Sequence, residues 1–307
     1  MEKRIFALLP LLLLTSCSNK NLTNLTIVSA SGAPSLAFYK YALDDHFETN
    51  NEPSNIIAMM AKQTKDITIL PTNAGIQAIV NKKLNYKIAS TITFGNLFIA
   101  STGNDDDGTM DKNDYIVLFQ KGSFPDVMFH SIYGASLDEG IHYVATAKEA
   151  AACLKTGINL SSNNEKVDYV LLAEPALYSV ISTSQGRKEY ANIQELYKQK
   201  SGGYDVFQAS IFVSNSANKD EVDNLLSNIE RDINEGLNNP YIIKEELLKS
   251  PTSESVYGCK PEVASTVTKN GNRMGLGFKN AFENKNAIDK FLEHFNIGKT
   301  NEEIYFK

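Results

Sequence analysis

Several residue types and motifs on which enzymes depend are scarce in this 307-residue chain. It has three Cys and four His, and His46, His130, His142 and His294 are scattered along the sequence. It contains neither a Gly-x-Ser-x-Gly nucleophile turn nor a His-Glu-x-x-His zinc helix. Protein metal sites need grouped His, Cys, Asp or Glu ligands, and no such group is visible. The sequence therefore argues against a hydrolase of these classes and against a metal-dependent or cofactor-dependent protein.

Two glycine motifs are incomplete. Gly298-Lys299-Thr300 matches the end of a phosphate-binding loop, but the glycine required five positions earlier is Glu293. Gly275-Leu276-Gly277 lacks the third glycine of a dinucleotide-binding turn, because that position is Asn280. Neither stretch supports a nucleotide site.

One long apolar run is present, and it lies at the amino terminus. Lys3 and Arg4 precede the run 5–14, which is too short for a stable membrane span and has the basic flank of a secretion signal. Leu14-Thr15-Ser16-Cys17 resembles the bacterial lipobox, in which the cysteine is lipidated. The alternative is an ordinary signal peptide with an incidental cysteine. We expect a lipoprotein signal peptide over 1–17, lipid on Cys17 that anchors the chain to the outer face of the cell membrane, and a tether over 18–24.

The charge and the remaining cysteines limit the partners. The formal net charge is −6, and loss of the signal segment with Glu2, Lys3 and Arg4 takes it to −7. An acidic chain argues against nucleic acid as the main partner. Cys153 and Cys259 would then lie in an oxidising compartment, where they could pair or remain free, because nothing in the sequence places them close together.

A turn near the start of the mature chain joins a strand pattern to a helix pattern. The apolar stretch 25–28 favours a strand, Gly32 allows close approach of a ligand to the backbone, and Pro34 suits the first turn of a helix. Apolar residues then follow at helical spacing, namely Leu36, Tyr39, Leu43 and Phe47. Free N–H groups at the start of that helix would suit a polar or anionic ligand atom.

The same layout occurs again further along the chain. The apolar stretch 115–119 runs into Gly122-Ser123-Phe124-Pro125, again small residues before a helix-starting proline. The stretch 66–75 and the stretch 167–176 also share an order of aspartate, apolar strand, proline turn and apolar helix. This repetition predicts two α/β lobes that face one cleft.

The boundaries of the lobes follow from breaks in the pattern. The segment 102–114, rich in Gly, Asn and Asp, predicts a junction, and a solvated link is favoured over a calcium loop because the EF-hand spacing is missing. The stretch 207–213 predicts a strand that returns to the first lobe, and helices that include 218–236 and 287–295 would pack on that lobe. We therefore expect lobe 1 over 25–103 and 214–307, and lobe 2 over 104–213.

The order of these motifs resembles the type II periplasmic binding proteins, and most closely those of nitrate, sulfonate, taurine and thiamine-pyrimidine importers. The resemblance covers 25–306 and rests on the lipobox, the two turns at Gly32 and Gly122, and Ala173-Glu174-Pro175. It implies a two-lobe α/β fold with a ligand cleft between the lobes, and delivery of a small molecule to an ABC permease and its ATPase. The chain departs from the pattern in having no Trp and a compact stretch before Asp66.

The resemblance implies a set of ligand-binding residues on the two cleft walls. Each has a structural alternative: Ser123 and Asn73 as helix caps, Glu174 as a solvated carboxylate, the aromatic residues as core, and Arg273 as a surface residue rather than an anion clamp. The candidates that the resemblance implies are Ser31, Gly32, Ala33, Thr72, Asn73, Ser123, Phe124 and Glu174. Two more follow from residue type alone: Phe94 could stack on a flat ligand, and Arg273 could hold an anion.

The sequence thus predicts a monomeric, lipid-anchored solute-binding protein that is not an enzyme. Its ligand would be a small sulfonate-, carboxylate- or pyrimidine-like molecule, and the sequence leaves the choice open. Two competing classes remain. One is an exported surface lipoprotein with an adhesion or structural role, and the other is an enzyme built on the same fold.

Overall fold

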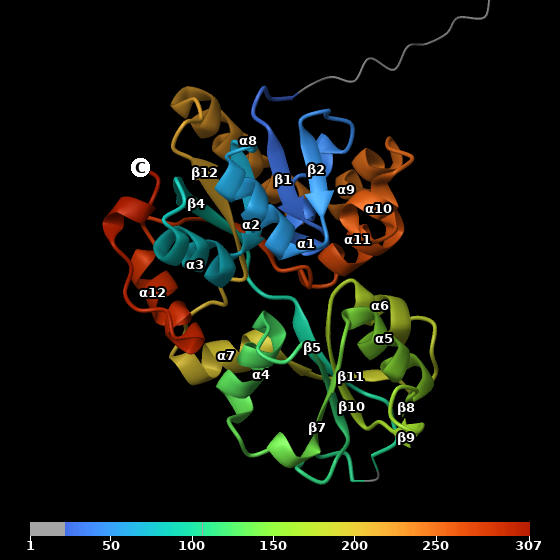
Figure 1. Ribbon diagram of the computed structural model, residues 1–307. Helices are drawn as coiled ribbons and strands as arrows, with labels where there is room; N and C mark the ends of the chain where they lie inside the picture. Colours follow the sequence, from blue (N-terminus) through green and yellow to red (C-terminus); the bar gives the residue numbers. More distant parts are fainter. Residues whose placement is uncertain (1–21, 106) are drawn as a thin grey trace, which may run out of the picture.

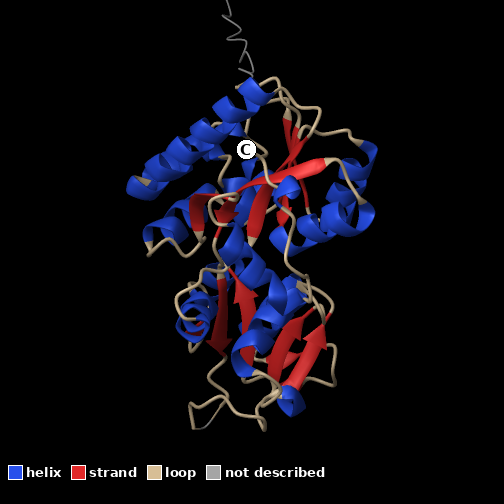
Figure 2. Ribbon diagram, turned by 90° about the vertical axis from the view of Figure 1, so that its left-hand side faces the viewer, coloured by secondary structure: helices blue, strands red, loops and turns tan. Residues whose placement is uncertain are grey.

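The computed structural model describes residues 22–105 and 107–307, which form two lobes stacked one above the other (Figure 1). The expected signal peptide 1–17, the lipid site Cys17 and most of the tether 18–24 lie outside the described residues. Each lobe is built on its own β-sheet, with helices on both faces of the sheet (Figure 2).

The sheet of the first lobe is mixed. Four of its strands run in one direction, whereas one edge strand and the strand that returns from the second lobe run in the opposite direction. The alternation of strands and helices with short turns in the sequence predicts a largely parallel sheet. This prediction is wrong for this lobe, because the returning strand inserts at the centre of the sheet. In spatial order, the six strands are β13 (Leu276–Asn280), β4 (Tyr86–Thr93), β12 (Ala209–Ser214), β3 (Ile67–Pro71), β1 (Ile27–Ala30) and β2 (Phe47–Asn50).

The sheet of the second lobe has five strands, and four of them run in the same direction. The strand that enters from the first lobe runs antiparallel to both of its neighbours. In spatial order, the strands are β11 (Lys188–Asn192), β5 (Leu97–Ser101), β10 (Tyr169–Ala173), β6 (Ile116–Phe119) and β7 (Ile141–Val144). A separate two-stranded ribbon consists of β8 (Ile158–Asn159) and β9 (Glu165–Lys166).

Helices cover both faces of the first sheet because its strands alternate apolar side chains between the two faces. Ile27 packs into the core of one face, whereas Val28 packs into the core of the other. The first face carries α1 (Ala33–Leu36), α8 (Lys219–Asn238), α9 (Pro240–Leu248), α10 (Ser253–Tyr257) and α11 (Pro261–Lys269). The second face carries α2 (Pro53–Lys62), α3 (Thr72–Lys82) and α12 (Lys285–Leu292).

The second sheet is covered in the same way. One face packs on α4 (Phe124–Tyr133) and α7 (Ile193–Ser201), and the other packs on α5 (Ala147–Thr156) and α6 (Ala176–Ile181). Thr146 and Glu149 have the spacing of a capping box, and half of it is present at the start of α5: Thr146 Oγ1 accepts a hydrogen bond from Glu149 N at 3.1 Å, whereas the Glu149 carboxylate accepts from Ala145 N at 3.0 Å.

The chain crosses between the lobes at 94–96 and again just before Ala209. Phe94-Gly95-Asn96 interrupts the strand pattern of 87–101 in the sequence, and in the structure it forms the gap between β4 and β5. The strand pairing puts β5 in the second sheet and β12 in the first, so both crossings precede the expected boundaries at 103/104 and 213/214.

The expected domain junction at 102–114 is wrong, because this segment joins β5 to β6 within the second sheet. Charge and Gly/Asn clusters mark a loop, but they carry no information about which sheet the flanking strands join.

The first helix is shorter than its apolar spacing predicts. It ends at Leu36, a 3₁₀ turn follows at Tyr39–Tyr41, and Phe47 begins β2. Tyr39 and Tyr41 are both buried beside the helices of the first lobe. Tertiary packing of these large side chains accounts for apolar positions that the spacing alone assigns to one helix face.

The lobes share one continuous apolar core on the side of α12. Phe124 of α4 stacks on Phe295 at a centroid distance of 6.1 Å, and Tyr197 of α7 meets Phe291 edge-on at 6.4 Å. The two lobes are therefore in direct contact as well as joined by the two crossings.

Candidate functional site

A cavity of about 340 Å³ lies between the two lobes, and we call it the interlobe cavity. The first lobe contributes Ala30, Ser31, Gly32, Ala33, Pro34, Asn51, Pro53, Pro71 and Ala209, and the crossings contribute Asn96 and Gln208. The second lobe contributes Phe124, Ala147, Ala173, Glu174, Pro175 and Ala176.

The lining residues come mainly from the beginnings of helices. In a parallel arrangement the carboxyl ends of strands meet at one edge of the sheet, and each strand leads into a helix that starts there. Here β1 ends at Ala30, β3 ends at Pro71 and β10 ends at Ala173, and all three of these residues line the cavity. The two sheets therefore face each other with the edges at which these parallel strands end.

Among the described residues, six helices start at this cavity. The first turn of a helix has N–H groups without an acceptor inside the helix, and its end of the macrodipole is positive. The surroundings of the cavity therefore favour a ligand atom that accepts hydrogen bonds or carries negative charge. The lining residues at or just before these starts are Ala33 of α1, Pro53 of α2, Pro71 before α3, Phe124 of α4, Ala147 of α5 and Ala176 of α6.

Half of the residues expected at the ligand line this cavity. The turn after β1 contributes three of them, and the second lobe contributes an aromatic ring and a carboxylate. They are Ser31, Gly32, Ala33, Phe124 and Glu174. The Phe124 ring also stacks on Phe295, so one of its faces is already covered by protein.

The other expected residues have different neighbours. Thr72 is buried, and its hydroxyl lies 2.7 Å from that of Ser210. Ser123 donates its hydroxyl hydrogen bond back to Phe119 O at 3.2 Å instead of capping α4 with its side chain.

Phe94 meets Phe207 edge-on at 5.9 Å and lies beneath the ammonium group of Lys279. Asn73 lies in the first turn of α3 and is half-buried. Neither is among the described residues that line the interlobe cavity.

Arg273 joins the two lobes by an ion pair. Its Nε and Nη2 each lie 2.8 Å from Glu174 Oε1, and its Nη1 pairs with Glu189. Burial by itself lowers the pKa of Arg273, but the hydrogen bonds and charges of Glu189 and Glu174 outweigh it and hold that pKa above its ordinary value. The guanidinium therefore forms its ion pairs with carboxylates of the protein itself.

Two carboxamides at the crossings belong to the site, although sequence reasoning missed them. Asn96 Nδ2 donates to Glu174 O at 2.8 Å, and Gln208 Nε2 donates to Asn96 Oδ1 at 2.9 Å. The position of Asn96 in the interruption between two strand patterns was the available signal. Gln208 offers none, because a glutamine before an apolar strand is an ordinary feature.

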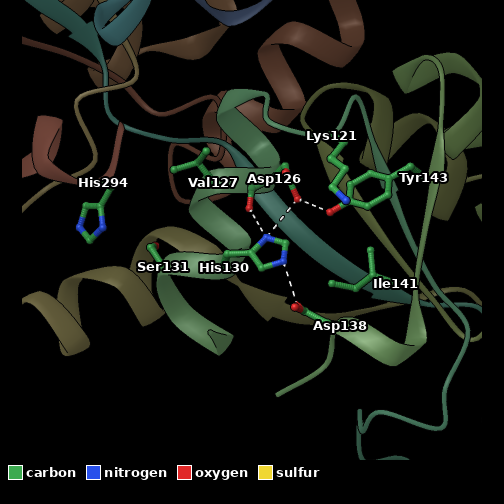
Figure 3. Close-up of a pocket in the computed structure, with 9 residues that line it drawn as sticks. All are labelled: Lys121, Asp126, Val127, His130, Ser131, Asp138, Ile141, Tyr143 and His294. Atoms are coloured by element: carbon green, nitrogen blue, oxygen red, sulfur yellow. Dashed lines mark hydrogen bonds and ion pairs between the residues drawn. The ribbon is translucent and has the colours of Figure 1, made fainter. Parts of the chain in front are cut away.

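A second, outer pocket of about 670 Å³ lies beside α4, outside the interlobe cavity (Figure 3). The His130 ring sits between two carboxylates, with Nδ1 3.1 Å from Asp126 Oδ1 and Nε2 3.2 Å from Asp138 Oδ1. Tyr143 also donates to Asp126 at 2.8 Å, and Gly122 N donates to its other oxygen at 2.6 Å. The carboxylate and imidazole groups thus already have partners within the protein.

The remaining cysteines are free. Cys153 lies in α5 of the second lobe, Cys259 lies between α10 and α11 of the first, and both are buried. Among residues 22–105 and 107–307, no group of three or more His, Cys, Asp or Glu is placed to hold a metal ion. Within the same ranges, no helix is long and apolar enough to span a membrane.

Comparison with known proteins finds similarity in structure only. No family model matches the sequence, and no curated protein matches it. An ABC transporter protein from Parabacteroides distasonis has a TM-score of 0.69 at 18% identity, with 89% of this chain and 92% of that chain covered. The ligand-binding component of an ABC-type import system from Staphylococcus aureus, solved with zinc bound, has a TM-score of 0.65 at 9% identity, with 92% and 95% covered.

The periplasmic aliphatic sulphonate-binding protein of Escherichia coli has a TM-score of 0.63 at 11% identity, with 92% of this chain and 91% of that chain covered. These matches extend over nearly the whole of each chain. They agree with the two sheets, the two crossings and the cavity between the lobes. The chain therefore has the type II periplasmic-binding-protein fold, as its order of motifs predicted.

Proposed function

We propose that the protein is an extracytoplasmic receptor that binds a small organic anion and delivers it to an ABC import permease with its ATPase. The observation that carries this proposal is the meeting of six helix starts at the interlobe cavity. The described lining residues include no Lys, Arg or His, so backbone N–H groups and helix dipoles would supply the attraction for the anion.

A sulfonate or a carboxylate suits this lining better than a flat heterocycle. Either head group carries one negative charge, which suits the positive ends of the helices that start at the cavity. A pyrimidine would need a free aromatic face, but Phe124 is stacked on Phe295. Sulphonate binding is the named property of one structural neighbour, and it supports the same class here.

Binding would close the lobes about the ligand, and no bond would be made or broken. The crossings at 94–96 and before Ala209 are the short connections at which the lobes can turn. In this proposal the receptor acts as a monomer without a cofactor, and lipid on Cys17 keeps it at the outer face of the cell membrane near its permease. An adhesion role would not account for the cavity between the lobes.

Thermal unfolding of the chain from Ser18 onward tests the proposal, with sulfonates, carboxylates, pyrimidines, vitamins and amino acids as additives. A compound at 100 times its dissociation constant should stabilise the fold by about 2.7 kcal/mol. We expect hits among sulfonates or carboxylates. If only uncharged or cationic compounds stabilise the fold, the anion class is contradicted. If no compound of the panel stabilises it, the proposed receptor function is contradicted.

A pair of variants on one helix makes the test specific to the cavity. Ala147→Asp places a carboxylate at the start of α5, where it favours the helix but repels an anion in the cavity. Ala152→Asp places the same charge on an exposed position of the same helix that does not line the cavity. We expect the first variant to lose the stabilisation by anions and the second to keep it.

A further inference from the structure

Arg273 reaches from the first lobe into a pocket of side chains on the second. It lies between α11 and β13, whereas its partners lie on the strands or strand ends of the other sheet. Glu174 directly follows β10, and Glu189 lies on β11. The ring of Phe98 on β5 lies beneath the guanidinium, with the ring centroid 4.0 Å from Arg273 Cζ. We call these four side chains the latch.

Two of the latch side chains are largely withdrawn from solvent. The Glu174 side chain is 0% exposed and that of Arg273 is 24% exposed. Glu174 Oε2 accepts a hydrogen bond from Tyr178 N in the first turns of α6 at 2.8 Å, so both carboxylate oxygens have donors. A buried carboxylate is costly without a charged partner, and this one depends on an arginine from the opposite lobe.

The loop that carries Arg273 is fixed against the first crossing. Phe94 N donates to Gly275 O at 2.7 Å, and Arg273 N donates to Val267 O at 3.2 Å. A Cβ on Gly275 would lie 2.1 Å from Gly95 O, and φ of Gly275 is +66°, so glycine allows this close approach. The guanidinium is therefore presented from a rigid part of the first lobe, next to the segment about which the lobes would turn.

Glu174 also lines the interlobe cavity, and this joins the latch to the site. An unpaired carboxylate at the wall would oppose the positive helix ends and repel an anion. We infer that Arg273 is a positioning residue with two effects: it holds the lobes together, and it neutralises Glu174 so that the closed cavity accepts a negative charge. The second effect rests on the proposed function, and the first does not.

Two measurements on the chain from Ser18 onward, which contains both lobes, separate these effects. Small-angle scattering without any additive reports how far the lobes open. Calorimetric titration with propanesulfonate and with its neutral analogue propanesulfonamide reports the charge preference of the cavity. The variants are Arg273→Gln, Glu174→Gln and the double variant, with Arg231→Gln as the control because Arg231 lies on α8 and is largely exposed.

We expect Arg273→Gln to increase the radius of gyration. We also expect it to weaken the binding of propanesulfonate about tenfold or more and that of propanesulfonamide less, because the unpaired charge of Glu174 at the cavity wall repels the anion. The double variant should recover the preference for the anion, since it removes that charge, while its lobes stay open. The control should match the wild type in both measurements.

Either of two results would overturn the inference. One is an unchanged radius of gyration in Arg273→Gln, and the other is an equal loss of both probes that the double variant does not recover. If the wild type binds neither probe, the choice of a sulfonate as ligand is contradicted, and the scattering of the ligand-free variants still decides whether Arg273 holds the lobes together.

Discussion

Single residues in this protein owe their roles to burial and partners more than to their chemistry in isolation. Glu174 is buried, yet each of its oxygens has a donor, and its backbone oxygen accepts from Asn96. Arg273 has the residue type of an anion clamp, but two carboxylates of the protein surround it. The same side chains with other neighbours would have had other functions.

The two described cysteines give a prediction at this scale. Burial raises the pKa of Cys259 to about 12, and burial together with the charge of Glu149 raises that of Cys153 above its ordinary value. Because the thiolate is the reactive form, neither should react with a disulfide reagent in the folded protein at pH 8. Titration of the chain from Ser18 onward should find no accessible thiol in buffer and two in guanidinium. A fast reaction of one thiol in the folded protein would contradict this.

Helices and strands fit together through specific small residues at their contacts. Gly75 in α3 faces Phe212 of β12, and a Cβ at Gly75 would lie 2.2 Å from the end of the phenyl ring. The absence of a side chain is therefore what lets α3 lie close to the central strand of the first sheet. Close packing of this kind leaves little room for added atoms.

Gly75→Ala should accordingly destabilise the protein by about 1–3 kcal/mol through overpacking, even though alanine is the better helix former. Urea unfolding would measure the change. Gly298→Ala is the matched control, because a Cβ at Gly298 meets nothing within 4 Å, and its effect should stay within about 0.5 kcal/mol. Replacing Phe212 by Leu as well should recover part of the loss at Gly75.

The whole molecule is two sheets held together by two covalent crossings and by contacts between side chains of both lobes. Besides the latch and the aromatic contacts of Phe124, Asp205 forms ion pairs with Lys198 of α7 and Lys279 of β13. Asp205 thereby links a helix of the second lobe to a strand of the first, just before the return crossing. Such contacts set how readily the lobes separate.

Asp205 leads to a prediction about pH. Burial raises its pKa, but the hydrogen bond and charge of Lys279 and the charge of Lys198 outweigh burial, so the pKa lies below its ordinary value. An unfolded Asp titrates at about 3.9, so the stabilisation is fully present above that pH and is lost as the pH falls through the lower folded value.

Asp205→Asn should therefore lower the urea midpoint at pH 7 and have a smaller effect near pH 2. Asp223→Asn is the control, since Asp223 and its partner Lys219 are both largely exposed and such pairs contribute little. An equal effect of Asp205→Asn at both pH values would mean that the charge of Asp205 does not account for the stabilisation.

Local sequence determined those features that depend on neighbouring residues. Three such features are the turn at Gly32, the helix cap at Thr146 and the break at Phe94-Gly95-Asn96. They follow from backbone preferences and hydrogen bonds within a few positions. Because the two lobes repeat one layout, the order of such local signals also predicted the fold class and the walls of the cavity near Gly32 and Glu174.

Tertiary structure alone decided which distant segments meet. The stretch 207–213 predicts a strand that returns to the first lobe, and β12 does so, but the strand pattern of β5 does not specify its sheet, because pairing depends on partners far away in the chain. For the same reason the sequence could not reveal that Arg273 meets Glu174, 99 residues away, or that Gln208 meets Asn96. Side-chain chemistry suggests what a residue can bind, but only the folded chain determines whether the protein itself already supplies that partner.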